Sequence, residues 1–377
     1  MKVLHINSYY PSSDLYRQML LHFEPESRCS HVVYVPVPAD RDATVRSVAS
    51  ADVSVVYSAD YRHLDRWNYH GKRLKIVRSL ERQIDLLTVS ATHAHHLFTA
   101  GGVAYELKRR YGIPYVVAVR NTDINWFFRY ALHLRSMGLA ILQEASRVVF
   151  ISPSGLKGLR NHVPCSRWPS VVAKSVIIPN GVDDYWLNNP HEQQSNSVKD
   201  AIKILYVGQM TRNKNVETVI SVSNELERRG YPTEAYIVGD GPDTKRIRRM
   251  AQRSRAPVRM VGRVDSKTEL IRLYRSSNVF VMPSFTETFG LAYIEAMSQG
   301  LPVICSRGQG IDGFFEDGNI GYACDSRNYK QMASRIIDIV ESLSEMSRRC
   351  TSAAQRFSWS KIVKEYAALY EAVENDA

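Results

Sequence analysis

The chain has 377 residues, of which 44% are hydrophobic and 23% charged, so it is expected to be a soluble globular protein with two domains. Its five cysteines lack metal-ligand spacing and no apolar run approaches the roughly 18 residues that span a bilayer, which favours a cytosolic protein with reduced thiols. The net charge of +11 belongs to one half, because residues 1–182 hold 23 Lys and Arg against 13 Asp and Glu, whereas residues 183–377 hold 26 against 25.

The first half alternates short apolar runs with amphipathic segments, which is typical of a doubly wound parallel sheet. The N-terminal MKVLHINSYY turns polar too early for a signal peptide and is interpreted as the first strand. Strands are predicted at residues 2–8, 52–58, 85–91, 114–120, 147–152 and 175–181, and helices at 16–23 and 101–112.

The second half restarts this pattern after a polar segment, residues 183–200, which is interpreted as a linker. Strands are predicted at 201–210, 233–241, 258–264, 278–284 and 302–306, and helices at 215–230, 290–300 and 359–373. The fold class is therefore α/β, with two Rossmann-like doubly wound domains. Such domains leave a cleft at the carboxyl ends of their strands, where ligands bind.

Two glutamates, Glu287 and Glu295, lie eight residues apart in the mostly apolar stretch SFTETFGLAYIEAMSQGLPVICS. Helical spacing starts near Gly290, where free N–H groups and the helix dipole favour a phosphate, and a glycine lets a diphosphate approach the backbone. Glu295 on the helix can accept hydrogen bonds from a vicinal diol such as a ribose. The alternative, that both glutamates are solvated, fits poorly with the apolar run that carries them.

Two further glycine turns follow predicted strands. VGQMTRNKN (residues 207–215) places a lysine before the next helix, and VGDGP spans residues 238–242. Neither matches the dinucleotide-binding or Walker patterns, which argues against a dehydrogenase. Each turn taken singly is more often a plain turn than a ligand site.

The stretch PSFTETFGLAYIEAMSQGLPVI resembles the E-x7-E signature of the family 4 (group 1) retaining glycosyltransferases, which have the GT-B fold. The likeness covers nearly the whole chain. It implies an N-terminal acceptor-side domain (1–185), a C-terminal nucleotide-sugar domain (186–357) and a C-terminal helix (358–377) that crosses back to the first domain. The other matching segments are THAHHLFTAGGVAYELKRRYGIPYVVAV, VIIPNGVDDYW, ILYVGQMTRNKN, YIVGDGP, MVGRV and FSWSKIVKEYAALY.

The resemblance also implies roles for individual residues. Glu295 holds the ribose of the nucleotide, Glu287 contacts the transferred sugar, and Lys214 neutralises the leaving phosphates. The implied catalytic residues are Glu287, Lys214, Asp123 and Arg120. The implied donor-binding residues are Glu295, Thr288, Phe289, Gly290, Gly208, Gln209, Arg212, Arg263 and Val264, and His95 and Asn121 are implied on the acceptor side of the cleft.

Three features depart from the family pattern. Relatives often carry an arginine where this chain has Gln209, and Arg212 could substitute for it. The His-Gly-x-Asp turn of many relatives reads RNTD here, so Arg120 replaces the histidine while Asp123 is kept. An arginine there can still donate hydrogen bonds or pair with a charged group. The glycine-rich loop after the first strand is replaced by SYYPSSD.

His93, His95 and His96 invite interpretation as a metal site. A catalytic zinc site needs three ligands around an open position, and three histidines this close at a strand end cannot all converge on one ion. A helix dipole and a lysine can stabilise a leaving diphosphate without a metal. No metal or cofactor is therefore expected.

The basic surplus includes a segment, residues 61–87, with an apolar helical stripe formed by Leu74, Val77, Leu80, Ile84 and Leu87. It is either an ordinary domain helix with a solvated face or a contact with anionic lipid at the inner face of the cell membrane. No nucleic-acid motif accompanies the charge, so nucleic acid is not an expected partner. The candidate membrane-contact residues are Arg62, Arg66, Trp67, Lys72, Arg73, Lys75 and Arg78.

The sequence thus predicts a cytoplasmic, metal-independent, retaining glycosyltransferase. It would move a sugar from a UDP- or GDP-sugar to a glycan or a lipid-linked acceptor in bacterial surface polysaccharide synthesis. Two alternatives stay open. One is a catalytically degenerate GT-B nucleotide-sugar-binding protein, which the changes at Gln209 and Arg120 would favour. The other is a nucleotide-sugar epimerase or hydrolase.

Overall fold

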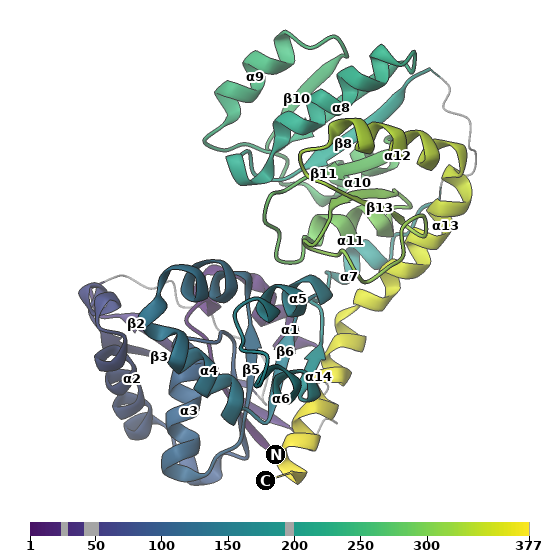
Figure 1. The fold of residues 1–377 in the computed structure, drawn as a ribbon. Coiled ribbons are helices and arrows are strands. Elements are labelled where there is room, and N and C mark those ends of the chain that lie inside the picture. The colour runs from purple at the N-terminus through teal and green to yellow at the C-terminus, as the bar shows by residue number, and fades with distance from the viewer. Residues whose placement is uncertain (24–28, 41–52, 193–199, 377) are drawn as a thin grey trace. The chain divides into compact units, whose positions relative to one another are not determined.

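The computed structural model describes residues 1–23, 29–40, 53–192 and 200–376 (Figure 1). The chain divides into two compact units. The N-terminal unit comprises Met1–Ile151, Gly155–Gly181 and Trp359–Ala377, and the C-terminal unit comprises Ser152–Ser154 and Val182–Ser358. Each unit is a parallel α/β domain, as the alternation of strands and helices predicts.

The N-terminal unit is built on a seven-stranded sheet with the order β3-β2-β1-β4-β5-β6-β7 and parallel pairing throughout. Its strands are β1 (Lys2–Ile6), β2 (Ser30–Pro38), β3 (Val53–Tyr61), β4 (Ala91–Ala94), β5 (Tyr115–Val119), β6 (Arg147–Phe150) and β7 (Ser175–Ile177). Its helices are α1 (Asp14–Leu21), α2 (Tyr69–Gln83), α3 (Thr99–Tyr111), α4 (Arg135–Glu144), α5 (Pro153–Arg160), α6 (Trp168–Ala173) and α14 (Trp359–Asn375).

Helices cover both faces of this sheet, so its central strands are apolar on both sides. In β5, Tyr115, Val117 and Val119 belong to the hydrophobic cluster that includes residues of α2, α3 and α4. Val116 and Ala118 point the opposite way, into the cluster that includes residues of α1 and α14. This two-sided burial explains why the strands read as continuous apolar runs rather than alternating ones.

The last helix, α14, returns the chain to the N-terminal unit, as the resemblance implies (Figure 1). Trp359, Ile362, Tyr366 and Tyr370 on its inner face are at most 3% exposed and pack on the sheet. Burial of a large apolar side chain contributes about 1.5–3 kcal/mol, so this face holds the helix firmly. The segment that starts at Trp359 is therefore a structural part of the N-terminal unit, whereas Ser358 belongs to the C-terminal unit.

The C-terminal unit has a six-stranded parallel sheet with the order β10-β9-β8-β11-β12-β13. Its strands are β8 (Ile202–Val207), β9 (Thr233–Val238), β10 (Val258–Gly262), β11 (Val279–Met282), β12 (Val303–Ser306) and β13 (Gly321–Cys324). Its helices are α7 (Asp184–Leu187), α8 (Val216–Arg228), α9 (Thr244–Gln252), α10 (Lys267–Arg275), α11 (Leu291–Ser298), α12 (Tyr329–Glu341) and α13 (Leu343–Ala354).

Two predicted elements differ from the structure. The strand predicted at 85–91 is instead a 3-10 turn, Leu86–Thr88, followed by β4, and Leu87 is 91% exposed rather than part of an apolar stripe. The predicted linker starts with a short helix, α7, whose Trp186 and Leu187 are buried. Residues 193–199 of that linker, and Asp52 of the strand predicted at 52–58, lie outside the described residues.

Candidate active site

The loops after β8, β9 and β10 stack on one another at the carboxyl edge of the C-terminal sheet. The backbone N–H of Gly208 donates to Val238 O at 3.0 Å, and that of Gly239 donates to Gly262 O at 2.7 Å. Gly239 has a φ of +123°, and a Cβ there would lie 2.0 Å from Gly208 O. The glycines of the VGQM and VGDG turns therefore allow these loops to pack closely, while the side chain of Gln209 is exposed.

Lys214 ends a 3-10 turn that is tied to the loop before α11. The side-chain amide of Asn213 donates to Thr286 O at 2.8 Å, and its oxygen accepts from the N–H of Thr286 at 3.0 Å. The next residue, Asn215, is buried in the left-handed conformation (φ +52°) and donates to Pro283 O at 3.1 Å. These bonds fix the turn that carries Lys214, and the sequence motifs did not indicate this structural role of Asn213 and Asn215.

Lys214 and Glu287 form an ion pair, with the Nζ 2.5 Å from Oε2. Their side chains are 24% and 11% exposed, so the pair is largely shielded from water. The other carboxylate oxygen of Glu287 accepts from the N–H of Thr288 at 3.1 Å, and the side chain of Gln309 accepts from the N–H of Glu287. Glu287, predicted to contact the sugar, and Lys214, predicted to contact the phosphates, thus lie side by side on two adjoining loops.

Helix α11 begins directly after Gly290, whose φ is +83°. A Cβ at this position would lie 2.6 Å from the Tyr293 ring, so the loop-to-helix turn requires glycine. Phe289 is buried against Phe314 and Phe357, which anchors the turn, and Thr288 is partly exposed. The first turn of the helix follows directly, with the free N–H groups that bind phosphate at helix starts.

Glu295 lies on α11 and is partly buried beside α10, where Tyr274 donates a hydrogen bond to its Oε2 at 3.1 Å. Burial raises the pKa of this carboxyl to about 7, although the Tyr274 hydrogen bond and the charge of Lys267 act in the other direction. The group therefore titrates near neutral pH. Buried carboxyls with a raised pKa are concentrated at functional sites.

The remaining predicted donor-site residues lie nearer the surface. Arg212 is exposed, and its side chain forms no hydrogen bond or ion pair with the other described residues. Arg263 is 67% exposed and pairs with Asp265 at 2.8 Å, and Val264 between them is partly buried.

Asp123 and Arg120 lie in the turn after β5 of the N-terminal unit. The buried carboxylate of Asp123 accepts hydrogen bonds from the N–H groups of Arg120 (2.8 Å), Leu97 (3.2 Å) and Phe98 (3.4 Å). Burial raises its pKa to about 6, against the effect of these bonds. Asp123 therefore organises the loops after β4 and β5, and Asn121 is partly exposed in the same turn.

His95 is not on an accessible surface, contrary to the prediction that it faces an acceptor. It is 2% exposed and its Nε2 lies 3.0 Å from Nδ1 of His5, which belongs to the neighbouring strand. His96 points elsewhere, with its Nε2 3.2 Å from the Ser8 hydroxyl. His95 and His96 follow β4 directly, and their side chains point in opposite directions. Of these two residues, His96 lines a pocket.

The sequence analysis argues that His93, His95 and His96 cannot converge on one ion, and in the structure the third histidine beside His93 and His95 is His5. Nitrogen atoms of His5, His93 and His95 lie within 4.8 Å of one another. His5 was missed because it is 88 residues from His93 in the sequence, and only the pairing of β1 with β4 brings the two together. These imidazoles are buried and neutral, because burial lowers their pKa.

The candidate membrane-contact residues have different environments. Trp67 is 79% exposed, and Arg62 and Arg78 are exposed. Arg73 is not, because its side chain is 12% exposed and lies 3.6 Å from Glu106. Lys75 pairs with Asp65 at 2.8 Å, Lys72 lines a pocket, and the side chain of Arg66 lies outside the described part of the structure.

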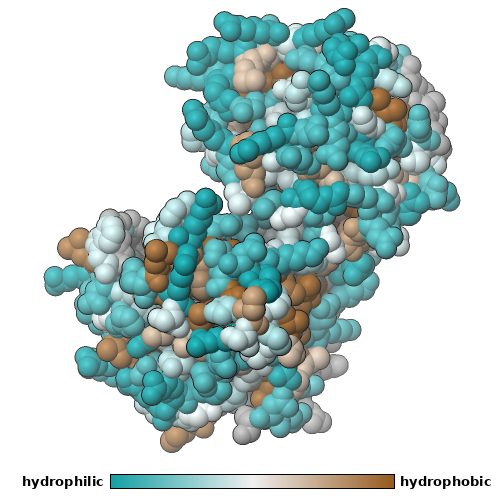
Figure 2. Space-filling model, viewed as in Figure 1, coloured by the Kyte–Doolittle hydropathy of each residue, from teal (hydrophilic) through white to brown (hydrophobic). Residues whose placement is uncertain are grey.

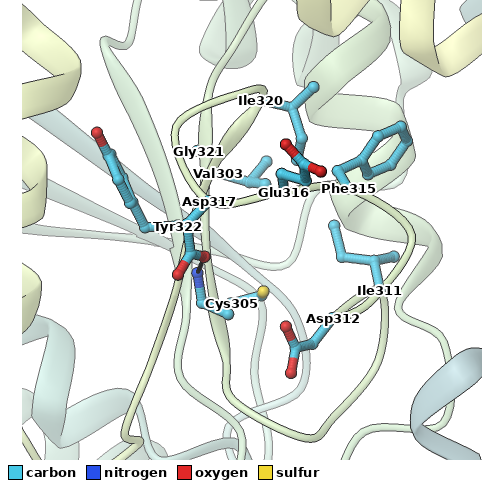
Figure 3. Close-up of a pocket in the computed structure, with 11 residues that line it drawn as sticks. Val303, Cys305, Ile311, Asp312, Phe315, Glu316, Asp317, Ile320, Gly321 and Tyr322 are labelled. Atoms are coloured by element: carbon cyan, nitrogen blue, oxygen red, sulfur yellow. Dashed lines mark hydrogen bonds between the residues drawn. The ribbon is translucent and has the colours of Figure 1, made fainter.

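A small cavity of about 250 Å³ between β12, β13 and the loop that joins them holds several acidic side chains (Figure 3). Two of them, Asp312 and Asp317, are paired with Arg307 at 3.4 and 2.5 Å. Asp317 also accepts from the N–H of Ala323 at 2.9 Å. The acidic groups therefore stabilise the loop, and none of the predicted donor-site residues lines the cavity.

Comparison with known proteins gives the class to which this chain belongs. Residues 5–185 match the family described as Glycosyltransferase Family 4, and residues 188–357 match the family described as glycosyl transferases group 1. The two matches together span nearly the whole chain. With the fold and the loops described above, they show that the chain belongs to the group 1 glycosyltransferases.

Individual relatives are distant. Glycogen synthase of Mycobacterium tuberculosis is 23% identical over 307 residues, which cover 75% of this chain and 68% of that protein. The structure of sucrose-phosphate synthase from Thermosynechococcus elongatus is similar, with a TM-score of 0.75, 20% identity and full coverage of both chains. HepE of Anabaena in complex with UDP has a TM-score of 0.71 and 16% identity, covering 99% of this chain and 100% of that one. These structures share the GT-B fold.

Proposed function

We propose that this protein transfers a sugar from a UDP- or GDP-sugar to a glycan or lipid-linked acceptor, with retention of configuration and without a metal ion. The observation that carries the proposal is the Lys214–Glu287 ion pair beside the glycine turn at the start of α11. Glu295 lies on the same helix. The UDP complex of the structural neighbour HepE supports a nucleotide donor. Bacterial surface polysaccharide assembly is the pathway we favour.

In the proposed reaction, Glu295 accepts the ribose hydroxyls, the first turn of α11 and Lys214 hold the diphosphate, and Glu287 contacts the sugar. The bond between the anomeric carbon and the diphosphate oxygen breaks while the acceptor oxygen bonds to that carbon from the same face. The acceptor proton leaves to the departing phosphate. The helix dipole and the Lys214 ammonium stabilise the negative charge that develops on this leaving group.

A thermal-shift panel with UDP, GDP, ADP and their sugars, on the wild type and Glu295→Ala, tests the proposal. A nucleotide that binds only the folded protein raises the melting temperature by mass action. We expect one base to stabilise the wild type and to lose most of its effect in the variant. If no nucleotide stabilises the wild type, the degenerate-binding alternative takes precedence.

The raised pKa of Glu295 predicts that nucleotide affinity depends on pH. The ionised carboxylate accepts both ribose hydroxyls, so lowering the pH from 8 to 6, through the pKa of about 7, should weaken binding about tenfold. Calorimetric titration of the nucleotide at several pH values measures this. Glu295→Gln is the matched control, because it keeps the titration of the nucleotide's own phosphate. Identical pH profiles for wild type and variant would contradict the assignment.

We also propose that the N-terminal unit contacts an anionic membrane surface. Leu64 and Trp67 are 75% and 79% exposed beside the basic α2, and exposed apolar groups next to basic ones suit a lipid interface. Figure 2 shows hydrophobic side chains gathered on the visible face of this unit, whereas the visible face of the other is mostly hydrophilic. Among the described residues, no helix is long and apolar enough to cross a bilayer.

Flotation with vesicles tests this contact. The protein is expected to float with vesicles that contain phosphatidylglycerol and to be released by 0.5 M salt, roughly the ionic strength that screens such contacts. Trp67→Ser should reduce the floating fraction several-fold, while Trp126→Ser, which removes another exposed tryptophan (54% exposed), serves as the control. Equal binding to neutral and anionic vesicles, or none to either, would end the proposal.

A further inference from the structure

A pocket of about 310 Å³ opens at the carboxyl edge of the N-terminal sheet. Residues that follow β1, β4 and β5, together with the last residues of β2 and β3, form its walls. The sheet order places β1 beside β4, where the strand order reverses, and parallel α/β sheets bind ligands at such a point. The volume suits one or two sugar rings.

Two cations line this pocket without a carboxylate partner. Lys72 comes from α2 and Arg120 from the turn after β5, and among the described residues no carboxylate oxygen lies within 4.0 Å of either charged group. The neighbours of Lys72 on the same helix differ, since Arg73 pairs with Glu106 and Lys75 with Asp65. Burial lowers the pKa of Lys72, which shows that its ammonium is partly removed from water.

The other titratable groups in the pocket do not neutralise these cations. The Asp123 carboxylate is occupied by the backbone N–H groups of Arg120, Leu97 and Phe98, and it forms no ion pair with either cation. His96 is neutral, because burial, together with the charges of Arg120 and Lys72, lowers its pKa to about 3. Lys72, Arg120 and His96 all line this one pocket, so both cations are available to the same ligand.

Three aromatic side chains, Tyr9, Tyr61 and Phe127, also line the pocket. Tyr9 is 50% exposed with its ring 4.5 Å from that of His96, and the Lys72 ammonium lies 4.0 Å from the centre of the Tyr61 ring. Phe127 is partly exposed. Aromatic faces offer apolar contact to the C–H faces of a sugar ring, and cations held partly out of water bind an anion more strongly than exposed ones.

We propose that this pocket binds a negatively charged sugar acceptor, with its phosphate or carboxylate on Lys72 and Arg120 and its ring against Tyr9, Tyr61 and Phe127. The inference rests on the proposed transferase function and specifies the chemistry of the acceptor. Arg120 stands where relatives carry a histidine, and its guanidinium can bind either anion through two parallel hydrogen bonds. Within the described part of the chain, the guanidinium of Arg120 is bonded only through its Nε, to His95 O at 3.2 Å, which leaves its other edge available for this contact.

Calorimetric titration of the full chain with glucose, glucose 6-phosphate and glucuronate tests the proposal, in the presence of saturating nucleoside diphosphate. At least one anionic sugar is expected to bind tenfold or more tightly than glucose. A preference for glucose 6-phosphate, with competition by inorganic phosphate, indicates a phosphorylated acceptor, and a preference for glucuronate indicates an acidic sugar. Equal binding of the neutral and anionic sugars, or no binding of any, overturns the proposal.

Variants locate the binding to this pocket. Lys72→Gln and Arg120→Gln are each expected to weaken binding of the anionic sugar about 10- to 100-fold, and Arg120→Lys to retain most of it. Arg78→Gln, on the exposed face of the same helix, is the matched control. Nucleotide-induced stabilisation should stay unchanged in all four variants, which shows that they fold. If Lys72→Gln and Arg120→Gln both bind the anionic sugar as tightly as the wild type does, the proposal is contradicted. If the wild type binds no nucleotide, the proposed function is contradicted instead.

Discussion

Lys214→Ala is expected to lower kcat by about two to three orders of magnitude, with a much smaller change in nucleotide affinity. Removal of one preorganised electrostatic group from an active site typically costs about 2.7–4 kcal/mol of transition-state stabilisation. Lys214 is assigned this role in the proposed site, since its turn is fixed by Asn213 and Asn215 and its side chain is 24% exposed. The leaving diphosphate gains charge only as the glycosidic bond breaks, so the loss should appear mainly in kcat.

Glu287→Ala should likewise lower kcat far more than nucleotide affinity, because its carboxylate is assigned to the sugar rather than to the nucleotide. The 2.5 Å contact between the two side chains further predicts that they act as a unit. The double variant should therefore be little worse than the poorer single variant, as is usual for coupled catalytic groups.

Steady-state release of the nucleoside diphosphate gives kcat and KM, and calorimetry gives nucleotide affinity. Lys245→Ala, an exposed lysine on α9, is the matched control and should behave as wild type. If Lys214→Ala keeps kcat within about threefold of wild type, Lys214 has no electrostatic role. Equal losses of turnover and nucleotide affinity in Glu287→Ala would contradict the assignment of that residue to the sugar.

Local sequence patterns predicted most of the fold because both sheets are parallel and buried on both faces. The strands they missed have weak signals: β2 contains Pro36 and Pro38, and β13 is the short GYAC. The turn at Gly290 could be predicted, since a strand, a glycine and an apolar helix follow one another within about twenty residues. The family resemblance then added the roles of Glu287 and Glu295.

Features that depend on contacts between distant segments could not be predicted. His5 joins His93 and His95 only because β1 pairs with β4, and Lys72 reaches a pocket only because α2 packs against the same edge of the sheet. The sequence placed Lys72 in a uniformly basic helical surface. The structure separates that surface into paired, exposed and pocket-lining groups, which side-chain spacing alone cannot distinguish.

The N-terminal unit is expected to lose stability steeply below pH 6.5 because five of its imidazoles are buried. His5, His31, His93, His95 and His96 are at most 6% exposed. Burial holds the pKa of His31 at about 4 and those of His93 and His96 at about 3, with His5 and His95 also lowered. In the unfolded chain each titrates near 6.5, so their contribution to stability is fully present above that pH and is lost as the pH falls.

The expected slope is large. Each imidazole that is neutral when folded and charged when unfolded removes about 1.4 kcal/mol per pH unit. Asp123 acts in the opposite direction between its folded pKa of about 6 and its unfolded value of 3.8, because there it is protonated only in the folded state. The unfolded state therefore binds about four more protons than the folded state. The free energy of unfolding falls by about 5 kcal/mol per pH unit, compared with a total of about 5–15 kcal/mol for a typical domain.

The unit should therefore unfold near pH 5, and hydrogen exchange read by mass spectrometry can localise the event. Peptides from β1, β4 and α14 should lose protection first, since the imidazoles lie between these elements and His93 contacts Tyr370 at 2.6 Å. His31→Gln should flatten the slope by about 1.4 kcal/mol per pH unit, because one buried imidazole is gone. His70→Gln, whose imidazole is exposed, should leave the slope unchanged. A stability that stays constant between pH 7 and 5 would mean that these histidines are hydrated or already charged in the folded protein.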